Sequence, residues 1–205
     1  MASESGARQT LREISRYRLA MAVTRRRPRI RWVVVPVCLL LIAAVISGLP
    51  IYVRPQVDPL RHADAILVLG GDGFSRYRLG IDLGMQGWAP KVILSNPGTD
   101  DEEWLTKACN TPHPGIELDC FAPDPPTTLG EGRELRRLAE RYGWRSVIVV
   151  TFTPHISRAR FILQRCFDGE LIMVASPTRI SLLDWASEYV YQTAGYVRAA
   201  LQPGC

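Results

Sequence analysis

The 205-residue sequence lacks the short signatures of several large protein classes. It contains no C-x-x-C pair, and its cysteine and histidine spacings do not match a zinc site. No G-x-G-x-x-G run opens a predicted helix, so a dinucleotide-binding fingerprint is not indicated. No G-x-S-x-G elbow surrounds a serine, which argues against a serine nucleophile of that type. Internal repeats and low-complexity tracts are absent as well. The function must therefore be sought in less common patterns.

The N-terminal quarter has few acidic residues, and its second part has no charged residue. Residues 1–31 hold nine arginines but only two acidic residues, and residues 32–53 hold no charged residue. As a helix, the uncharged run spans about 33 Å, enough to cross a bilayer core. The arginine excess predicts a cytoplasmic N-terminus, with residues 54–205 outside the cytoplasm. A cleavable signal peptide is the alternative, but the run is longer than usual and no A-x-A site follows.

The basic character belongs to the tail and not to the rest of the chain. The formal net charge is +5, whereas nine arginines less two glutamates place +7 on residues 1–31, so the remainder carries −2. Such a tail faces anionic lipid, and no nucleic-acid partner is predicted. The predicted organisation is a basic cytoplasmic tail at 1–31, a transmembrane helix at 32–53, a linker at 54–59 and an extracytoplasmic domain at 60–205.

The cysteines are interpreted through this topology. Cys38 lies in the expected span, and the other four would be exported to a compartment where disulfides persist. Cys109 and Cys120 flank a turn-rich loop, which favours a bridge between them. A second bridge, between Cys166 and Cys205, is left open.

Strand and helix patterns alternate through residues 60–205. Short apolar runs bounded by turn residues predict strands at 63–69, 91–94, 116–121, 147–150 and 171–174. Helical patterns lie between them, and residues 181–201 predict a closing helix packed by its apolar face. Short connections of this kind predict an α/β fold with a doubly wound, mostly parallel, Rossmann-like sheet of about five strands.

The clearest candidate site lies at residues 146–161. A β-branched run, 147–150, is typical of a strand covered on both faces, and a Thr-Pro pair then predicts an immediate helix start at Thr153 and Pro154. His155 and Arg158 share a face of the first turn, beside free backbone N–H groups. This combination favours an anion site at the sheet edge where open α/β folds bind ligands.

The order of motifs resembles that of the SanA/YdcF-like family of bacterial envelope proteins. Gly-Gly follows the first strand, an arginine heads the first helix, Ala-Pro precedes the second strand, and S-x-x-G follows it. Further on come T-x-G-E and V-T-x-x-x-H-x-x-R-A-R, and the match covers roughly residues 62–195. The resemblance implies a Rossmann-like domain, tethered by one N-terminal transmembrane helix in the bacterial plasma membrane. It also implies a part in envelope barrier function or in peptidoglycan or surface-glycan metabolism, without an agreed reaction.

Site residues are assigned by position in these motifs. The expected catalytic residues are His155, Glu131 and Asp72, with Asp72 a second base or a metal ligand. The expected ligand- or phosphate-binding residues are Gly70, Gly71, Arg76, Ser95, Gly98, Thr151 and Arg158. Two departures from the family pattern stand out. Asn96 and Pro97 replace a usual glycine, and the threonine motif aligns with either Thr127 or Thr128.

These residues predict an enzyme, a hydrolase or transferase, acting on a phosphorylated or lipid-linked envelope intermediate. Glycine turns, arginines and a helix N-terminus suit a phosphate, while histidine and glutamate suit proton transfer. No metal site is assigned, and the cofactor is unknown, with a divalent metal left open. One alternative is a binding module for a nucleotide-like or sugar-phosphate ligand. The other is an envelope scaffold that acts through the closing helix, near Trp185 and Tyr189. The oligomeric state is not predicted.

Overall fold

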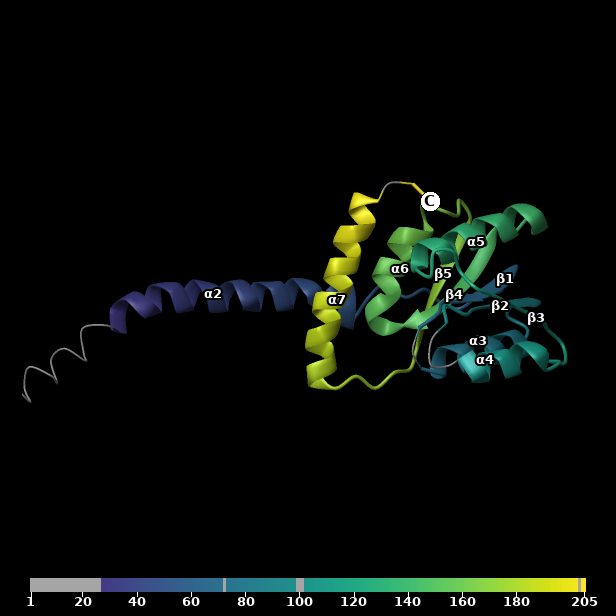
Figure 1. Ribbon diagram of the computed structural model, residues 1–205, viewed down its shortest axis with the longest axis horizontal. Coiled ribbons are helices and arrows are strands. Elements are labelled where there is room, and N and C mark those ends of the chain that lie inside the picture. The colour runs from purple at the N-terminus through teal and green to yellow at the C-terminus, as the bar shows by residue number, and fades with distance from the viewer. Residues whose placement is uncertain (1–26, 72, 99–101, 203) are drawn as a thin grey trace, which may run out of the picture. The chain divides into compact units, whose positions relative to one another are not determined.

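The computed structural model describes residues 27–71, 73–98, 102–202 and 204–205 (Figure 1). The chain divides into two compact units, residues 1–47 and 48–205. Helix α2, Arg27–Gly48, belongs almost entirely to the first unit. The stretch Arg31–Val53 is long and apolar enough to cross a membrane. Its last residues, Leu49–Val53, form a short π-helix, η1, that already belongs to the second unit.

The second unit is built on one parallel five-stranded sheet. Its strands are β1 (Ala65–Val68), β2 (Lys91–Ser95), β3 (Glu117–Phe121), β4 (Ser146–Phe152) and β5 (Glu170–Ser176). Their spatial order is β3-β2-β1-β4-β5, and every neighbouring pair is parallel. The predicted doubly wound α/β fold is therefore confirmed.

Helices cover both faces of this sheet. They are α3 (Ser75–Met85), α4 (Glu102–Asn110), α5 (Thr128–Tyr142), α6 (Ile156–Leu163) and α7 (Leu182–Leu201). Helices α3 and α4 lie on one face and α5 and α6 on the other, while α7 lies beside α6 (Figure 1). The helix expected to start at Thr153 and Pro154 begins instead with a 3-10 turn, η2 (Thr153–His155), before α6.

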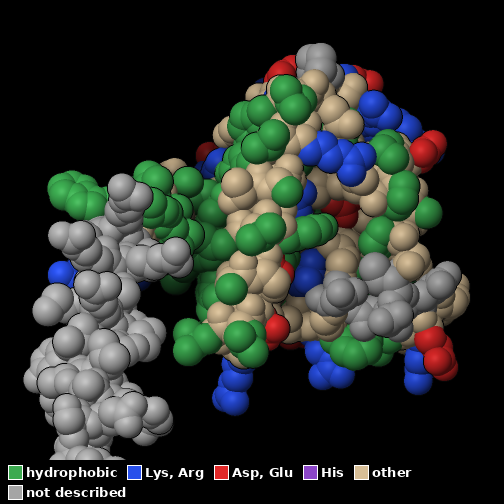
Figure 2. Space-filling model, turned by 60° about the vertical axis from the view of Figure 1, so that its left-hand side comes forward, with side chains coloured by type: hydrophobic (Ala, Val, Ile, Leu, Met, Phe, Trp, Pro, Cys, Tyr) green, Lys and Arg blue, Asp and Glu red, His purple; other side chains and the backbone are tan. Residues whose placement is uncertain are grey.

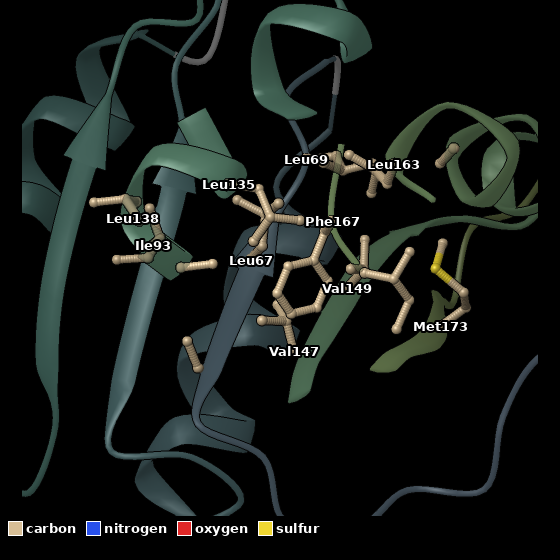
Figure 3. Packing of buried hydrophobic residues seen from close by; sticks show 14 of the residues in the cluster. Leu67, Leu69, Ile93, Leu135, Leu138, Val147, Val149, Leu163, Phe167 and Met173 are labelled. Carbon is tan, nitrogen blue, oxygen red and sulfur yellow. The ribbon is translucent and has the colours of Figure 1, made fainter. Parts of the chain in front are cut away.

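The strands are buried on both sides, which explains their continuous apolar sequences. Alternate residues point to opposite faces of a strand. Leu67, Val149 and Met173 therefore pack beneath α5 and α6, where Leu135 and Leu163 meet them (Figure 3). Their neighbours along the same strands, Ile66, Val150 and Ile172, pack with residues of α3 and α4 on the other side.

Two disulfides tie peripheral segments to this core. Cys109 in α4 is bonded to Cys120 in β3, as predicted. Cys166, just after α6, is bonded to Cys205, the pairing that the sequence left open. Cys38 is free and exposed.

The closing helix differs from the prediction. Its existence and limits agree, and Ser181 caps it by accepting the Asp184 N–H at 3.2 Å. However, Leu183 is 84% exposed and Val190 is 72% exposed, so the expectation that both pack against the domain is wrong. Gln192 and Ala199 are buried instead, because they lie on the side of α7 that faces α6.

Candidate functional site

The predicted site residues collect where the strand order reverses. With the order β3-β2-β1-β4-β5, the chain builds the sheet outward from β1 in one direction and then from β4 in the other. In open α/β sheets, ligands bind outside the carboxyl ends of strands at such a switch point. Gly70 follows β1 here, and Thr151 and His155 lie at the end of β4.

Glu131 is the acidic centre of this edge. It lies in the first turn of α5, is buried, and its Oε1 accepts the Gly70 N–H at 2.6 Å. Burial raises the pKa of Glu131, because a charged carboxylate loses its hydration. The Gly70 hydrogen bond, Ser95 and the charges of Arg76 and Arg158 oppose this rise. A carboxyl group in such surroundings holds its proton more readily than an exposed one does, which suits it to proton transfer.

Arg76 joins the turn after β1 to this centre. It is buried at the start of α3, and its Nη1 donates to the Gly70 carbonyl at 2.9 Å. Its guanidinium carbon lies 5.0 Å from the centre of the Phe152 ring. Gly71 has a φ of +123°, and a Cβ there would lie 3.0 Å from the Arg76 guanidinium. The glycine is thus required both by the backbone conformation and by the arginine beside it.

His155 is held between two hydroxyl groups. Its Nε2 lies 3.2 Å from Thr128 Oγ1, and its Nδ1 lies 3.0 Å from Thr151 Oγ1. Burial lowers the pKa of His155 well below its ordinary value, and the charges of Arg158 and Arg76 lower it further. The ring is therefore neutral at pH 7, so one nitrogen donates and the other accepts. Thr128 is the member of the Thr127–Thr128 pair that contacts the histidine.

Arg158 connects the edge to the last helix. Its Nε donates to Gln192 Oε1 at 2.7 Å, and its guanidinium carbon lies 5.5 Å from the centre of the Tyr191 ring. Burial lowers the pKa of Arg158, while Tyr191, Glu131 and Glu188 raise it. The Arg158 side chain is thus partly desolvated, and its position is fixed by contacts with Gln192 and Tyr191 of α7.

Three buried hydroxyl oxygens near these strand ends have no hydrogen-bond partner among the described residues. Ser95 ends β2, Ser176 ends β5, and Thr127 immediately precedes α5. The Ser95 hydroxyl lies close enough to Glu131 to favour its charged form, although no hydrogen bond of good geometry joins the two side chains. Buried polar groups are normally paired, so these three hydroxyl groups are available to hydrogen-bond a polar ligand at this edge.

The structure brings most of the predicted site together. Electrostatic interactions or hydrogen bonds link Glu131 to Gly70, Ser95, Arg76 and Arg158, and link His155 to Thr151 and to both arginines. Gly71 lies beside Arg76. Gly98 instead lies in an exposed turn, where its N–H donates to Asn96 Oδ1 at 3.1 Å. The prediction for Asp72 lies outside the described residues.

Sequence reasoning missed two contributors. Neither Gln192 nor Phe152 is among the predicted site residues, although they contact Arg158 and Arg76 respectively. Glu188 and Gln192, four residues apart, place two polar groups on the side of α7 that also carries Gly195 and Ala199, and this polar pair is the signal that could identify Gln192. Phe152 carries no comparable signal, because an aromatic residue at a strand end is ordinary.

Figure 2 shows the face crossed by α7, with a hollow beside the helix. Lysine or arginine side chains and an acidic side chain are visible within it. Within residues 27–71, 73–98, 102–202 and 204–205, no three histidine, cysteine, aspartate or glutamate residues are grouped to hold a metal. The chemistry available from the described side chains is therefore that of two arginines, a carboxyl group, a neutral histidine and several hydroxyls.

No protein-family model matches the chain, and no curated protein sequence matches it.

Proposed function

We propose that the protein is a membrane-anchored enzyme of the bacterial cell envelope. Its substrate is a phosphorylated, lipid-linked intermediate of peptidoglycan or surface-glycan metabolism, and its reaction is a hydrolysis or a group transfer. The resemblance to the SanA/YdcF-like family supports the envelope assignment. The arginine-rich tail and the apolar helix support a cytoplasmic N-terminus with the folded domain outside.

The observation that carries the proposal is a pair of arginines, Arg76 buried and Arg158 half-buried, around a carboxyl group of raised pKa. When Glu131 is protonated, Arg76 and Arg158 lose a nearby counter-charge and gain from an anion in its place. Arginine binds phosphate oxygens through two parallel N–H donors. The unpaired hydroxyls of Ser95 and Ser176 add hydrogen-bond capacity at the same sheet edge. A phosphate or diphosphate fits this combination of charge and hydrogen-bonding groups.

Among the described candidates, Glu131 is best placed for proton transfer. Its raised pKa suits a general acid that protonates a leaving oxygen. His155 uses both ring nitrogens on threonine hydroxyls, so its role here is to orient Thr128 and Thr151. Asp72 remains a proposed second base or metal ligand.

One observation favours a second candidate function, a binding module without turnover. The lowered pKa of His155 and its two hydroxyl partners suit a rigid ligand cradle as well as a catalytic site. Such a module would hold a nucleotide-like or sugar-phosphate ligand through Arg76 and Arg158.

The test uses the full chain in lipid nanodiscs that contain polyprenyl-diphosphate-linked sugars, with and without Mg²⁺. Products and retained lipid are followed by mass spectrometry for the wild type, Glu131→Gln and Arg158→Gln. Arg133→Gln, an exposed position on α5, is the control with the same charge change as Arg158→Gln. A product formed by the wild type and the control, and lost in Glu131→Gln, supports the enzyme.

Retention of the lipid without product, abolished in Arg158→Gln, would replace the enzyme by the binding module. If no lipid is retained or converted by folded protein, both proposals fail. The scaffold alternative would then be tested at Trp185 and Tyr189 of α7.

A further inference from the structure

Helix α7 presents an apolar stripe to the outside of the domain. Positions spaced three or four residues apart lie on one face of a helix. In α7 this face is formed by Leu183, Ala186, Val190, Ala194, Val197 and Leu201. Leu183, Val190, Val197 and Leu201 are all exposed, and the charged residues of the helix lie off the stripe. Figure 2 shows hydrophobic side chains along the length of this helix.

A stripe of this length requires a partner. The helix has 20 residues and is therefore about 30 Å long. Contiguous exposed apolar surface on a folded domain marks a site of contact with protein or membrane. The residues packed against α7 identify which of the two it is.

The end of the candidate membrane span is fixed to the middle of α7. Tyr52, next to the last residue of the span Arg31–Val53, is buried, and its hydroxyl lies 2.9 Å from Thr193 Oγ1. The Tyr52 and Tyr189 rings meet edge to face with centroids 5.0 Å apart. The Ser157 hydroxyl of α6 donates to the Ile51 carbonyl at 2.8 Å. The point where the chain leaves a bilayer is thus held against α7 and α6.

The stripe continues directly from this contact. Thr193 is three residues after Val190 and four before Val197, so the three side chains are neighbours on the helix surface. A residue that touches Tyr52 lies at the depth where the span ends. Val190 and Val197 are each about one helical turn from Thr193, roughly 5–6 Å, so they lie close to the same depth.

We propose that α7 lies along the membrane surface, with the stripe buried at the boundary between lipid head groups and acyl chains. The proposal rests on the membrane anchor of the proposed function. Interfacial helices combine an apolar face of this kind with a polar face turned away from the lipid. Tyrosines are also common at this depth, and Tyr52 and Tyr189 lie where the span meets α7.

The opposite side of the same helix forms part of the candidate site. Gln192 is fully buried, accepts from Arg158 and donates to Glu188 Oε2 at 2.9 Å. A Cβ on Gly195 would lie 2.8 Å from Arg158 Cδ, so the arginine packs directly on the helix backbone. A helix that rests on lipid therefore positions a phosphate-binding arginine. This arrangement suits a substrate whose phosphate is presented at the bilayer surface by its own lipid.

Spin-label depth measurements on the full chain in lipid nanodiscs test the proposal. Cys38 is the free cysteine of the described chain, and Cys109, Cys120, Cys166 and Cys205 are protected in disulfides. In a Cys38→Ala background, Val190→Cys and Val197→Cys receive a nitroxide. Glu140→Cys, at an exposed position of α5, is the aqueous control. Wild-type protein labelled at Cys38 reports on the span. Collisions with oxygen, which enters lipid, are compared with collisions with a water-soluble nickel chelate.

We expect the labels at 190, 197 and Cys38 to collide more often with oxygen than with the nickel chelate. The label at 140 should collide more often with the chelate. If 190 and 197 behave like 140 while Cys38 is immersed, the α7 proposal is overturned and the anchor stands. If the chelate reaches the label at Cys38, both the proposed membrane anchor and the α7 proposal are contradicted. Dipolar broadening at 190 that disappears on dilution with unlabelled protein would also overturn the proposal, because a second copy would then cover the stripe.

Discussion

The sheet edge and the outer face of α7 both depart from the usual distribution of side chains. Ionisable groups are buried at the edge, whereas apolar groups are exposed on α7. At the edge, Glu131, His155 and Arg76 are buried, although ionisable groups favour water. On α7, Leu183 and Val190 are exposed, although leucine and valine favour the core. Arg158 lies between the two regions, bonded to Gln192 on the inner side of α7.

Burial alone therefore does not identify a functional region. A buried ionisable group is stabilised by its own neighbours, such as the Gly70 N–H at Glu131, so its role is tested by removing one partner. An exposed apolar side chain has few protein neighbours to lose, so its role is tested by changing what surrounds the protein. Four predictions follow this division, beginning with the largest effect.

Glu131→Ala is expected to lower the free energy of unfolding by about 3–5 kcal/mol, because it leaves a cavity and unpairs buried groups, including the Gly70 N–H. Glu131→Gln keeps an oxygen that accepts this N–H and resembles the protonated acid, so its loss should be about 1 kcal/mol or less. Denaturant unfolding of the full chain in detergent measures both. Equal losses for the two variants would show that the carboxyl group is not held as described.

His155→Ala should lower the free energy of unfolding by about 2–3 kcal/mol, because the Thr128 and Thr151 hydroxyls both lose their partner. A double-mutant cycle with Thr151→Val isolates one of these bonds and should give a coupling of about 1 kcal/mol. Additive losses in the cycle would contradict the Nδ1 hydrogen bond.

The contribution of His155 to the stability of the folded protein should fall on acidification below pH 6.5, the ordinary pKa of histidine. Because the pKa of His155 is lowered in the folded protein, the unfolded chain binds the proton first. The contribution of His155 is thus fully present above pH 6.5 and is lost as the pH falls towards the folded value, with a slope of up to about 1.4 kcal/mol per pH unit.

Unfolding of wild type and His155→Gln, measured between neutral pH and mild acid, gives this contribution as a difference. Glu131 acts in the opposite direction. Its raised pKa makes its contribution largest in acid and lost as the pH rises above 4.5, the ordinary value, through the folded value. Parallel pH profiles for wild type and His155→Gln would argue against a buried neutral histidine.

Val190→Thr should change the free energy of unfolding in detergent by no more than about 0.5 kcal/mol, because the side chain is mostly exposed on the domain. The matched change in the core, Val149→Thr at a fully buried position of β4, should cost about 2 kcal/mol. Near-ultraviolet circular dichroism during unfolding compares the two. A large loss for Val190→Thr would mean that the stripe packs against protein.

Much of the fold could be predicted, because local patterns carry it. The β-branched run 147–150 indicated a strand buried on both faces, and β4 lies in the interior of the sheet. Alternating strands and helices permit few topologies, so the parallel doubly wound sheet followed. The candidate site followed in turn, since the carboxyl ends of parallel strands share one edge. Gly98 did not join it, because its turn points the chain to the exterior.

Long-range packing decided the rest. The periodicity of residues 181–201 predicted an amphipathic helix but not the surroundings of its apolar face. Gln192 and Ala199 face inward because Arg158 of α6 donates to the Gln192 side chain and Arg165, just after α6, donates to the Ala199 carbonyl. The bridge from Cys166 to Cys205 depends on where α7 ends relative to α6, which no local pattern records.

Local sequence patterns were enough to predict the order of strands and helices, the apolar helix near the N-terminus and the strand ends that carry the polar residues. These features depend on side-chain periodicity and on residues close together in the chain. Three features could be seen only in the folded structure. His155 has two threonine partners, Arg158 is bonded to Gln192 of α7, and the apolar stripe of α7 points outward. Each of these depends on contacts between segments far apart in the sequence, or on which of two faces the rest of the fold leaves open.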